Sequence, residues 1–406
     1  MNRVVITGMG IVSPIGNTPA AVKAALVEGK SGIQAMPDWA QYSGLRSLIA
    51  GPVEGLEPRD IPRAWRRTMG RVSLLAAFAA RDAVGDSRLD AAAIGSDRTG
   101  VAMGSTTGSA AALERFFGDF CVRRSITGQE GTTFMKVASH TVMANVAAML
   151  GVKGRGLAPC TACASSAQAI GDGFEIIRHG LQDIMICGGA EELHMTTAAV
   201  FDVVSAASRR YNDTPHLSPR PFDRGRDGLV VGEGAAAVVL EEYRHAVGRG
   251  APIYGEVRGY ATCCDAYHIT QPSSDGMRRC MQEAARSAGL APTDLDYLNA
   301  HATGTEMGDA AEAEALRAFV GDAVPVSGTK GYTGHTLAAC GAMEVIFCLL
   351  MMRDGFVAPT LNLTDVAPEC GGLRHVQQLV HCSPRLIMTS NFAFGGVNAS
   401  LVLAKA

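Results

Sequence analysis

The stretch TACASSAQAIG, Thr161–Gly171, puts a cysteine directly before a run of helix-forming residues. We therefore expect Cys163 at a helix N-terminus, where backbone N–H groups and the helix dipole favour a thiolate. A small buried thiol without chemistry is the commoner role of a cysteine, so Cys163 alone does not establish a site. Cys160 makes the pair a C-x-x-C, but the chain has neither a second such pair nor an H-x-x-x-H spacing, which argues against structural zinc.

Two patches with histidines follow far along the chain. NAHATGT (Asn299–Thr305) places His301 after the apolar run Tyr297–Ala300, at the kind of strand end where α/β proteins hold ligands. KGYTGH (Lys330–His335) places a second histidine in a glycine-bracketed turn. Singly, a structural histidine and a solvated lysine are the commoner interpretations. Together with Cys163, the two imidazoles supply a nucleophile and N–H donors for carbon–carbon bond formation on thioesters.

Short β-rich runs alternate with alanine-rich helical stretches, which predicts an α/β fold with mostly parallel, buried strands. We expect strands at Arg3–Thr7, Thr99–Met103, Asp183–Cys187, Ala236–Glu241, Ile253–Tyr260, Tyr297–Ala300, Leu386–Thr389 and Ala399–Ala404. We expect helices at Ala20–Glu28, Val72–Val84, Ser165–His179, Gly276–Ala288, Asp309–Phe319 and Ala338–Asp354.

The start of the chain is faintly repeated after a seam near Arg249–Pro252, because both segments run from a strand into a glycine and a small-residue loop. This pattern predicts two related halves, residues 1–250 and 251–406. The first half is the larger, and we expect an insertion between about Gly29 and Arg71 to account for it.

Composition limits the classes of function. The 406 residues are 47% apolar and 18% charged, so the chain can bury a large core and disorder is excluded. A net charge of −3 argues against nucleic acid as a partner. Eleven cysteines without a framework indicate free thiols in a reducing cytoplasm. No apolar segment reaches the roughly eighteen residues that span a bilayer, so we expect a cytosolic protein without a membrane partner.

With these patches in hand, the chain resembles the β-ketoacyl-acyl carrier protein synthases of the elongating types I and II. The resemblance covers nearly the whole chain and rests on VVITGMGIVSPIGN, TACASSAQAIG, GGAEEL, YNDTP, RPFDRGRDGLVVGEGA, NAHATGTEMGD, KGYTGHTLAACGAMEVI and NFAFGGVNASLVL. GGAEEL with Phe201 and Asp202 is more typical of type I, whereas Asp265–Thr270 is more typical of type II. The resemblance implies a thiolase-like fold, in which two similar halves form a five-layered αβαβα sandwich, assembled as a homodimer.

The resemblance also implies a decarboxylative Claisen condensation in fatty-acid elongation. Cys163 would accept the acyl chain, and His301 and His335 would hold the malonyl thioester carbonyl by donating N–H bonds. Neither imidazole should carry a charge for that role. Lys330 would set the local field and orientation, paired with Glu312.

Further site residues follow from the same resemblance. The backbone N–H groups of Cys163 and Phe394 would form the oxyanion hole, with Phe394 as a gate on a turn loosened by Gly395 and Gly396. Thr270, Thr303 and Thr305 would bind the pantetheine arm, and Gly108 would line the acyl pocket near the dimer interface. Asp309 and Glu312 would support the site structurally. The alternative for each of these is an ordinary turn or surface residue.

No cofactor is required in this family, because acyl groups arrive on the phosphopantetheine of acyl carrier protein. A structural monovalent cation at Asn299, Glu344 and Asn391 is a further expectation of the resemblance. Acyl carrier proteins are strongly acidic, and the basic residues that would dock one are Arg63, Arg66, Arg67, Arg123 and Arg124.

Three rival functions remain open at this stage. The family's usual NSFGFGG reads SNFAFGG here and its His-Gly-Thr reads His-Ala-Thr, which leaves room for a ketosynthase of a specialised polyketide or polyene pathway. A non-catalytic chain-length-factor-like subunit would lack the nucleophile, whereas Cys163 is present. A degradative thiolase would carry a second cysteine in a C-terminal C-G-G turn, and Cys370, in ECGG, is the nearest match.

Overall fold

The computed structural model describes residues 1–406, and its strands form two halves with the same topology. The first half contains β1 (Val4–Val12), β4 (Thr99–Gly104), β5 (Gly156–Leu157), β6 (Ile184–Glu191) and β7 (Gly234–Glu242). The second half contains β8 (Gly255–Cys264), β9 (Tyr297–Ala300), β10 (Pro325–Gly328), β12 (Leu386–Ala393) and β13 (Val397–Ala404), with β11 (Arg374–His375) at its edge.

Strand pairing relates the two halves. In the first half β1 pairs antiparallel with β7, β7 antiparallel with β6, and β6, β4 and β5 are parallel. In the second half β8, β13, β12, β9 and β10 repeat these four pairing senses in the same order. The halves join where β1 pairs antiparallel with β8. The faint sequence repeat at β1 and β8 therefore marks the first strand of each half, and the two halves share the same order of strand pairings.

The helices are numbered along the chain. They are α1 (Pro19–Glu28), α2 (Arg63–Arg66), α3 (Arg71–Ser87), α4 (Ala91–Ile94), α5 (Ala110–Arg123), α6 (Phe134–Val137), α7 (Thr141–Leu150), α8 (Ser165–Arg178), α9 (Met195–Val203), α10 (Tyr243–Gly248), α11 (Ser274–Ala288), α12 (Glu306–Phe319), α13 (Lys330–Thr333) and α14 (Cys340–Asp354). The predicted insertion before α3 contains α2 and the two-stranded sheet β2 (Gln34–Ala35) and β3 (Ile49–Ala50).

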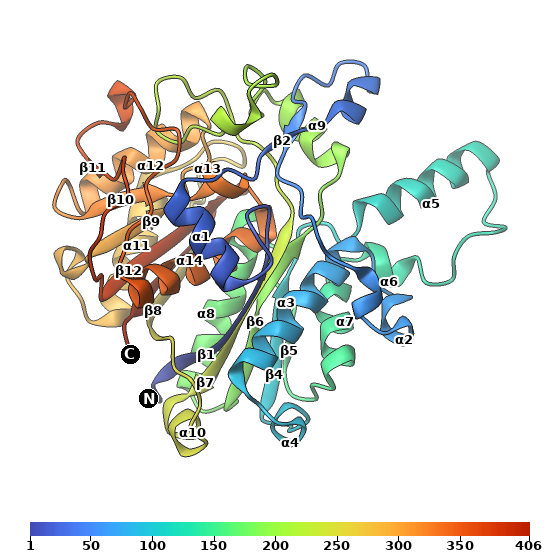
Figure 1. Cartoon of the computed structure of the whole chain (residues 1–406), viewed down its shortest axis with the longest axis horizontal. Coiled ribbons are helices and arrows are strands. Elements are labelled where there is room, and N and C mark those ends of the chain that lie inside the picture. Colours follow the sequence, from blue (N-terminus) through green and yellow to red (C-terminus); the bar gives the residue numbers. More distant parts are fainter.

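Two long helices lie between the halves, and other helices cover the outer faces (Figure 1). α8 and α14 contact each other and strands of both halves, whereas α3 covers the first half and α11 the second. α14 is almost entirely buried, which explains why its sequence is apolar on every side. This is the predicted thiolase-like sandwich of five layers, and it is confirmed.

Small residues set the spacing of the outer layer. A Cβ at Gly8 or Gly10 of β1 would overlap the carbonyl oxygens of Ala83 and Ala79, on the alanine-rich face of α3. Glycine in the strand and alanine in the helix therefore allow the two backbones to approach closely.

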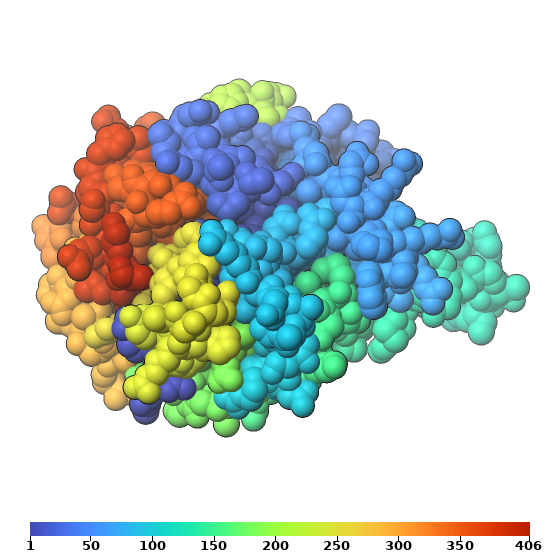
Figure 2. All heavy atoms as spheres, turned by 60° about the horizontal axis from the view of Figure 1, so that its bottom comes forward, coloured from blue at the N-terminus to red at the C-terminus, as the bar shows by residue number.

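α5 projects from the body of the molecule, and the teal projection at the right of Figure 2 shows the same arm as spheres. None of its residues is buried, although the arm from α5 to α6 carries several large apolar side chains. Those exposed are Leu113, Phe117, Phe120, Val122, Ile126, Phe134 and Met135. Although α5 contacts α6 and α6 contacts α7, much of the apolar surface of this arm is therefore left exposed to solvent.

The strands and helices expected from the sequence are all present, with ends that differ by a few residues. The sequence interpretation missed β10, α5, α7 and α9. β10 has only four residues, and α5 contains Gly118 and three phenylalanines, which weaken the helical signal. None of the helices combines the length and apolarity that a membrane crossing requires.

Gly10→Ala tests the close packing of β1 on α3. We expect it to destabilise the protein by about 1–3 kcal/mol, because the added methyl group overlaps the Ala79 carbonyl and backbone must shift. Calorimetric melting temperatures measure the effect. Gly118→Ala on the projecting helix is the matched control, since its Cβ would meet nothing within 4 Å. Equal melting temperatures for the two variants would contradict the packing argument.

Candidate active site

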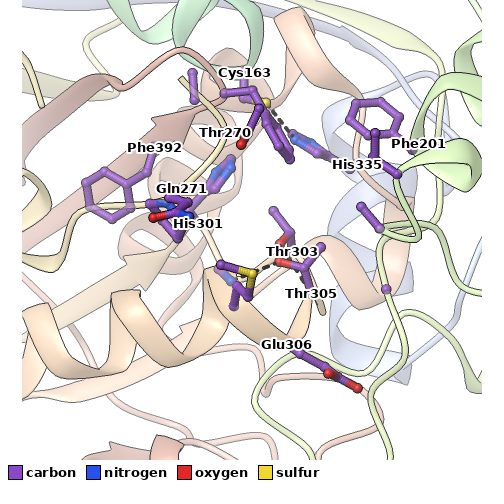
Figure 3. A pocket seen from close by; sticks show the side chains of 18 of the residues that line it. Cys163, Phe201, Thr270, Gln271, His301, Thr303, Thr305, Glu306, His335 and Phe392 are labelled. Carbon is purple, nitrogen blue, oxygen red and sulfur yellow. Dashed lines mark hydrogen bonds between the residues drawn. The ribbon is translucent and has the colours of Figure 1, made fainter. Parts of the chain in front are cut away.

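Cys163, His301 and His335 meet where the two halves join. Cys163 lies in a 3-10 turn (Ala162–Ala164) just before α8, His301 follows β9, and His335 follows α13. The three side chains are buried, and one ligating atom from each lies within 4.8 Å of the other two. His335 Nε2 is 2.9 Å from Cys163 Sγ, a contact drawn as a dashed line in Figure 3. The rings of His301 and His335 are 5.1 Å apart at 82°.

Strained backbone accompanies each of these residues. Ala162, which precedes Cys163, has φ +47°, and Ala302, which follows His301, has φ +41°. Leu337, two residues after His335, has φ +44°. Residues other than glycine rarely adopt the left-handed region, and such outliers gather at functional sites where the surrounding structure holds them.

The hydrogen bonds of His301 determine its tautomer. Lys330 Nζ lies 3.2 Å from its Nδ1, and the Asn391 side-chain amide nitrogen lies 3.4 Å from the same atom. Both neighbours are donors, so Nδ1 accepts and the proton of a neutral ring is on Nε2. Burial, together with the Lys330 ammonium and His335, lowers the pKa of His301 well below its usual value. The ring is therefore a neutral N–H donor at pH 7.

His335 is also uncharged. Burial and then the nearby Lys330 ammonium lower its pKa well below the usual value. Its Nδ1 is buried without a hydrogen-bond partner, so Nε2 is the ring atom available for chemistry. Both imidazoles thus agree with the expectation that neither is cationic.

Lys330 pairs with Glu344 and not with Glu312, which corrects the sequence-based pairing. Its Nζ donates to Glu344 Oε1 at 2.5 Å and to the His301 carbonyl oxygen at 2.6 Å. Asn391 donates to the other Glu344 oxygen at 2.7 Å. Burial opposes the charge of Lys330, but Glu344 offsets this and the pKa of Lys330 is raised, so the ammonium persists.

Glu312 and Asp309 hold the backbone of the His301 loop. Glu312 accepts from the N–H groups of His301 and Ala302, each at 2.6 Å. Asp309 accepts from Gly304 at 3.0 Å and from Phe222 at 2.7 Å. These two residues therefore have contacts of the predicted supporting kind.

The expected thiolate at Cys163 is wrong. Burial raises the pKa of the Cys163 thiol to about 12, and this outweighs Lys330 and the backbone N–H groups of Phe394 and Cys163, which lower it. The short turn before α8 is too deeply buried for the helix terminus to compensate. The free enzyme therefore holds a thiol next to His335.

The comparisons with known proteins now decide the family. The model of the β-ketoacyl synthase N-terminal domain matches residues 1–246, and that of the C-terminal domain matches residues 254–364. The chain belongs to the β-ketoacyl synthase family. Members of this family are acyltransferases, so the protein is an enzyme of that class.

Similar proteins match this β-ketoacyl synthase along its whole length. The 3-oxoacyl-[acyl-carrier-protein] synthase 1 of Escherichia coli K12 is 39% identical over all of this chain and 99% of its own. A solved β-ketoacyl synthase from Burkholderia phymatum is 44% identical over the full length of both chains, with a TM-score of 0.97. A type II polyketide ketosynthase, solved in complex with its acyl-carrier protein, is 29% identical over all of this chain and 99% of its own, with a TM-score of 0.91.

A cavity of about 980 Å³ opens onto the site of this synthase. Thr270, Thr303, Thr305 and the Phe394–Gly396 turn all line it. Figure 3 shows Thr303 and Thr305 facing the same space as His301. Gly395 and Gly396 have φ +93° and +73°, so the turn needs glycine at both positions. Phe394 is 45% exposed and its ring lies 5.8 Å from that of Phe201.

Gly108 is not among the residues that line this cavity. It has φ +69°, and a Cβ there would overlap the carbonyl oxygen of Val137, the last residue of α6. Gly108→Phe would therefore strain the backbone and cannot by itself report on acyl length. Its place in an acyl pocket at a dimer interface stays a prediction.

The proposed cation ligands are only partly free to bind an ion. Both Glu344 oxygens already accept hydrogen bonds, and Asn299 is bonded to Tyr297 and Thr389. Asn391 Oδ1, by contrast, is buried without a partner and fits a cation ligand. The structural cation stays a prediction.

The predicted docking arginines lie at two places outside the cavity. Arg63 and Arg67 are exposed at α2, while Arg66 is half-buried. Arg123 and Arg124 are exposed at the end of α5, with Arg123 3.5 Å from Asp119. In Figure 1 both helices lie on the same side of the molecule.

Sequence reasoning missed Glu191, a buried carboxyl close to the site. It accepts from Thr106 Oγ1 at 2.7 Å and from the Ala338 N–H at 3.4 Å, and it further raises the pKa of Cys163. Both acidic residues of GGAEEL are buried, and nothing in the motif indicates that Glu191 is the one close to Cys163.

Lys330→Met tests the buried ion pair. We expect a loss of about 3–5 kcal/mol in stability, because Glu344 would keep an unpaired charge in a buried site. Adding Glu344→Gln should restore part of the loss by removing that charge. Arg98→Met is the control, since its pair with Asp183 is partly exposed and should be worth less than about 1 kcal/mol. If Lys330→Met and Arg98→Met lower the melting temperature equally, the Lys330–Glu344 pair does not stabilise the site more than an exposed ion pair does.

Proposed function

We propose that the protein is a 3-oxoacyl-[acyl-carrier-protein] synthase of fatty-acid elongation. It joins malonyl-acyl carrier protein to an acyl chain held on Cys163, with loss of carbon dioxide. The observation that supports this function most directly is that the buried Cys163 thiol and the neutral imidazoles of His301 and His335 lie close together and line one large cavity. The 3-oxoacyl synthase names of full-length relatives support it.

In the first half-reaction Cys163 attacks the thioester carbonyl of the incoming acyl chain. The thiol proton is transferred to the departing thiol of the carrier, while the His335 Nε2–H group, 2.9 Å from the sulfur, stabilises the thiolate as it forms. The N–H groups of Phe394 and Cys163 stabilise the oxyanion. Both N–H groups lower the pKa of the Cys163 thiol, which supports this role.

In the second half-reaction the malonyl thioester carbonyl accepts N–H bonds from His301 Nε2 and His335 Nε2. The malonyl carboxylate leaves as carbon dioxide and its bonding electrons form an enolate on that carbonyl. The enolate carbon attacks the Cys163 thioester, and the Cys163–acyl bond breaks. Cys163 leaves as a thiolate and takes a proton from solvent to return to the thiol. Neutral donors in a dry site suit an oxygen that becomes negative only during reaction.

The rival functions are not favoured. A degradative thiolase needs a second cysteine that faces the substrate. Cys370, the last residue of η7 (Pro368–Cys370), does not line the cavity, and neither does Cys340, whose Sγ is 3.3 Å from the Cys163 carbonyl oxygen. A chain-length-factor-like subunit would not keep Cys163 in contact with His335. The polyketide ketosynthase is less similar, at 29% identity, than the 3-oxoacyl synthase at 39%.

The synthase would act as a cytosolic homodimer. Eleven free cysteines support a reducing compartment. The exposed apolar residues of the α5–α6 arm support a partner subunit, because monomers rarely expose such a surface. A monovalent cation at Asn391 would have a structural role. The protein would need no cofactor of its own, because the acyl groups arrive on the phosphopantetheine of acyl carrier protein.

His301→Ala and His335→Ala are expected to lower decarboxylation of the malonyl unit by about a hundred-fold or more, since each removes a donor to the developing oxyanion. Acyl transfer to the protein should partly survive, because its oxyanion hole is backbone. Carbon dioxide release from malonyl-acyl carrier protein gives the first rate. Mass spectrometry after labelled acyl transfer gives the second and should find the label on Cys163. Parental decarboxylation in either variant, or label on Cys160 alone, would contradict these roles.

Acyl carrier protein would dock on Arg63, Arg66, Arg67, Arg123 and Arg124. Exposure of four of these on one side of the molecule supports an electrostatic, salt-sensitive contact with an acidic partner.

Arg63→Glu with Arg67→Glu is the sharper test of docking, because both side chains are exposed whereas Arg66 is half-buried. We expect the KM for acyl-carrier-protein substrates to rise about ten-fold or more at low salt, with turnover of small acyl thioesters unchanged. Arg244→Glu, at an exposed arginine of α10, controls for net charge. An equal rise in KM for Arg244→Glu would contradict docking at α2.

A further inference from the structure

Two consecutive arginines line the cavity together with Asp227. Asp227 accepts three hydrogen bonds, from Ser208 Oγ at 2.7 Å and from the backbone N–H groups of Arg209 and Arg210 at 2.9 and 2.8 Å. This carboxylate therefore fixes the backbone of both arginines.

The two guanidinium groups differ in their partners. Arg210 donates to the carbonyl oxygens of Gly225 and Arg226, at 3.2 and 2.8 Å, and its Nε lies 3.6 Å from Asp227. The half-buried Arg209 side chain makes no hydrogen bond and no ion pair in the structure. Arg209 is therefore the one cavity-lining arginine whose charge is uncompensated by a side chain or carbonyl.

This segment lies against the threonine loop of the active site. The N–H of Gly228, next to Asp227, donates to the Gly304 carbonyl oxygen at 3.0 Å. Gly304 lies between Thr303 and Thr305, whose hydroxyl oxygens are 2.9 Å apart. Arg209 and the two hydroxyl groups are thus attached to a single rigid part of the cavity wall.

The acidic residues that line the cavity do not pair with the Arg209 guanidinium group. Asp265 accepts from Asn398 at 2.6 Å, and Glu312 accepts from two backbone N–H groups. Glu306 is exposed at the start of α12, and Figure 3 shows its carboxylate directed away from Thr303 and Thr305. The cavity therefore offers an incoming anion one free, planar donor group.

We propose that Arg209 binds the phosphate of the phosphopantetheine arm that carries the substrate. The proposal rests on the proposed function and adds a phosphate subsite to it. A chain reaching Cys163 past Thr303 and Thr305 presents its thioester to the thiol, its amides to the hydroxyls and its phosphate to the cavity rim. Guanidinium suits that end, because its fork of N–H donors matches two phosphate oxygens and it stays charged at any working pH.

The test compares two small substrates that carry the same short acyl group, one on pantetheine and one on 4′-phosphopantetheine. Neither contains carrier protein, so docking arginines do not enter. In the parent protein we expect kcat/KM for acyl transfer to Cys163 to be about ten-fold higher with the phosphorylated thioester. Arg209→Gln should abolish that preference and leave the rate with acyl-pantetheine unchanged.

The unphosphorylated substrate controls for folding within each variant. Arg209→Lys should recover part of the preference, because it keeps the charge without the fork. Arg210→Gln should keep the whole preference, since its guanidinium is committed to carbonyl groups. A ratio that is the same in the parent and in Arg209→Gln overturns the phosphate subsite alone. If the parent acylates Cys163 from neither thioester, the proposed acyl transfer itself is overturned.

Discussion

The active site depends on the hydrogen bonds and the ion pair that the Lys330 ammonium group makes. It is buried, and it donates at once to Glu344, to the His301 carbonyl oxygen and to His301 Nδ1. The last contact leaves the His301 proton on Nε2, where it can reach a substrate. The same charge lowers the pKa of both imidazoles and opposes the effect of burial on Cys163. One cation therefore fixes the tautomer of His301, adds to the effect of burial in keeping both imidazoles neutral, and lowers the pKa of Cys163 against the effect of burial.

Burial makes this arrangement effective and also costly. In a dry site each N–H donor interacts strongly with an oxygen that becomes negative, because no water competes. The same dryness raises the pKa of Cys163 to about 12, so the thiol has to lose its proton during the reaction with the help of His335. Positive φ angles at Ala162, Ala302 and Leu337 indicate that backbone strain, too, is held in place by the surrounding layers.

The repeated topology explains how distant segments meet. α8 and α14 occupy equivalent positions between the two halves, and each begins next to a reacting group, α8 after Cys163 and α14 after His335. β9 brings His301 to the same place from the second half. A site built at such a junction takes residues from both halves, and the cavity above it is lined by loops from both, which include Arg209 and the Phe394 turn.

The sequence by itself determined most of the strands, the long buried helices, the family resemblance and the residues Cys163, His301, Lys330 and His335, because each of these leaves a local pattern of small residues, periodicity or motif. Only the tertiary structure decided that Lys330 pairs with Glu344 instead of Glu312, that Cys163 stays a thiol and that Gly108 lies away from the main cavity. It also decided that Arg209 is free while Arg210 is not. The partner of a charged group, the burial of a thiol and the exposure of a side chain to the cavity all depend on which residues distant in the chain come together. A local sequence pattern does not specify the distance between two such side chains or whether solvent reaches them.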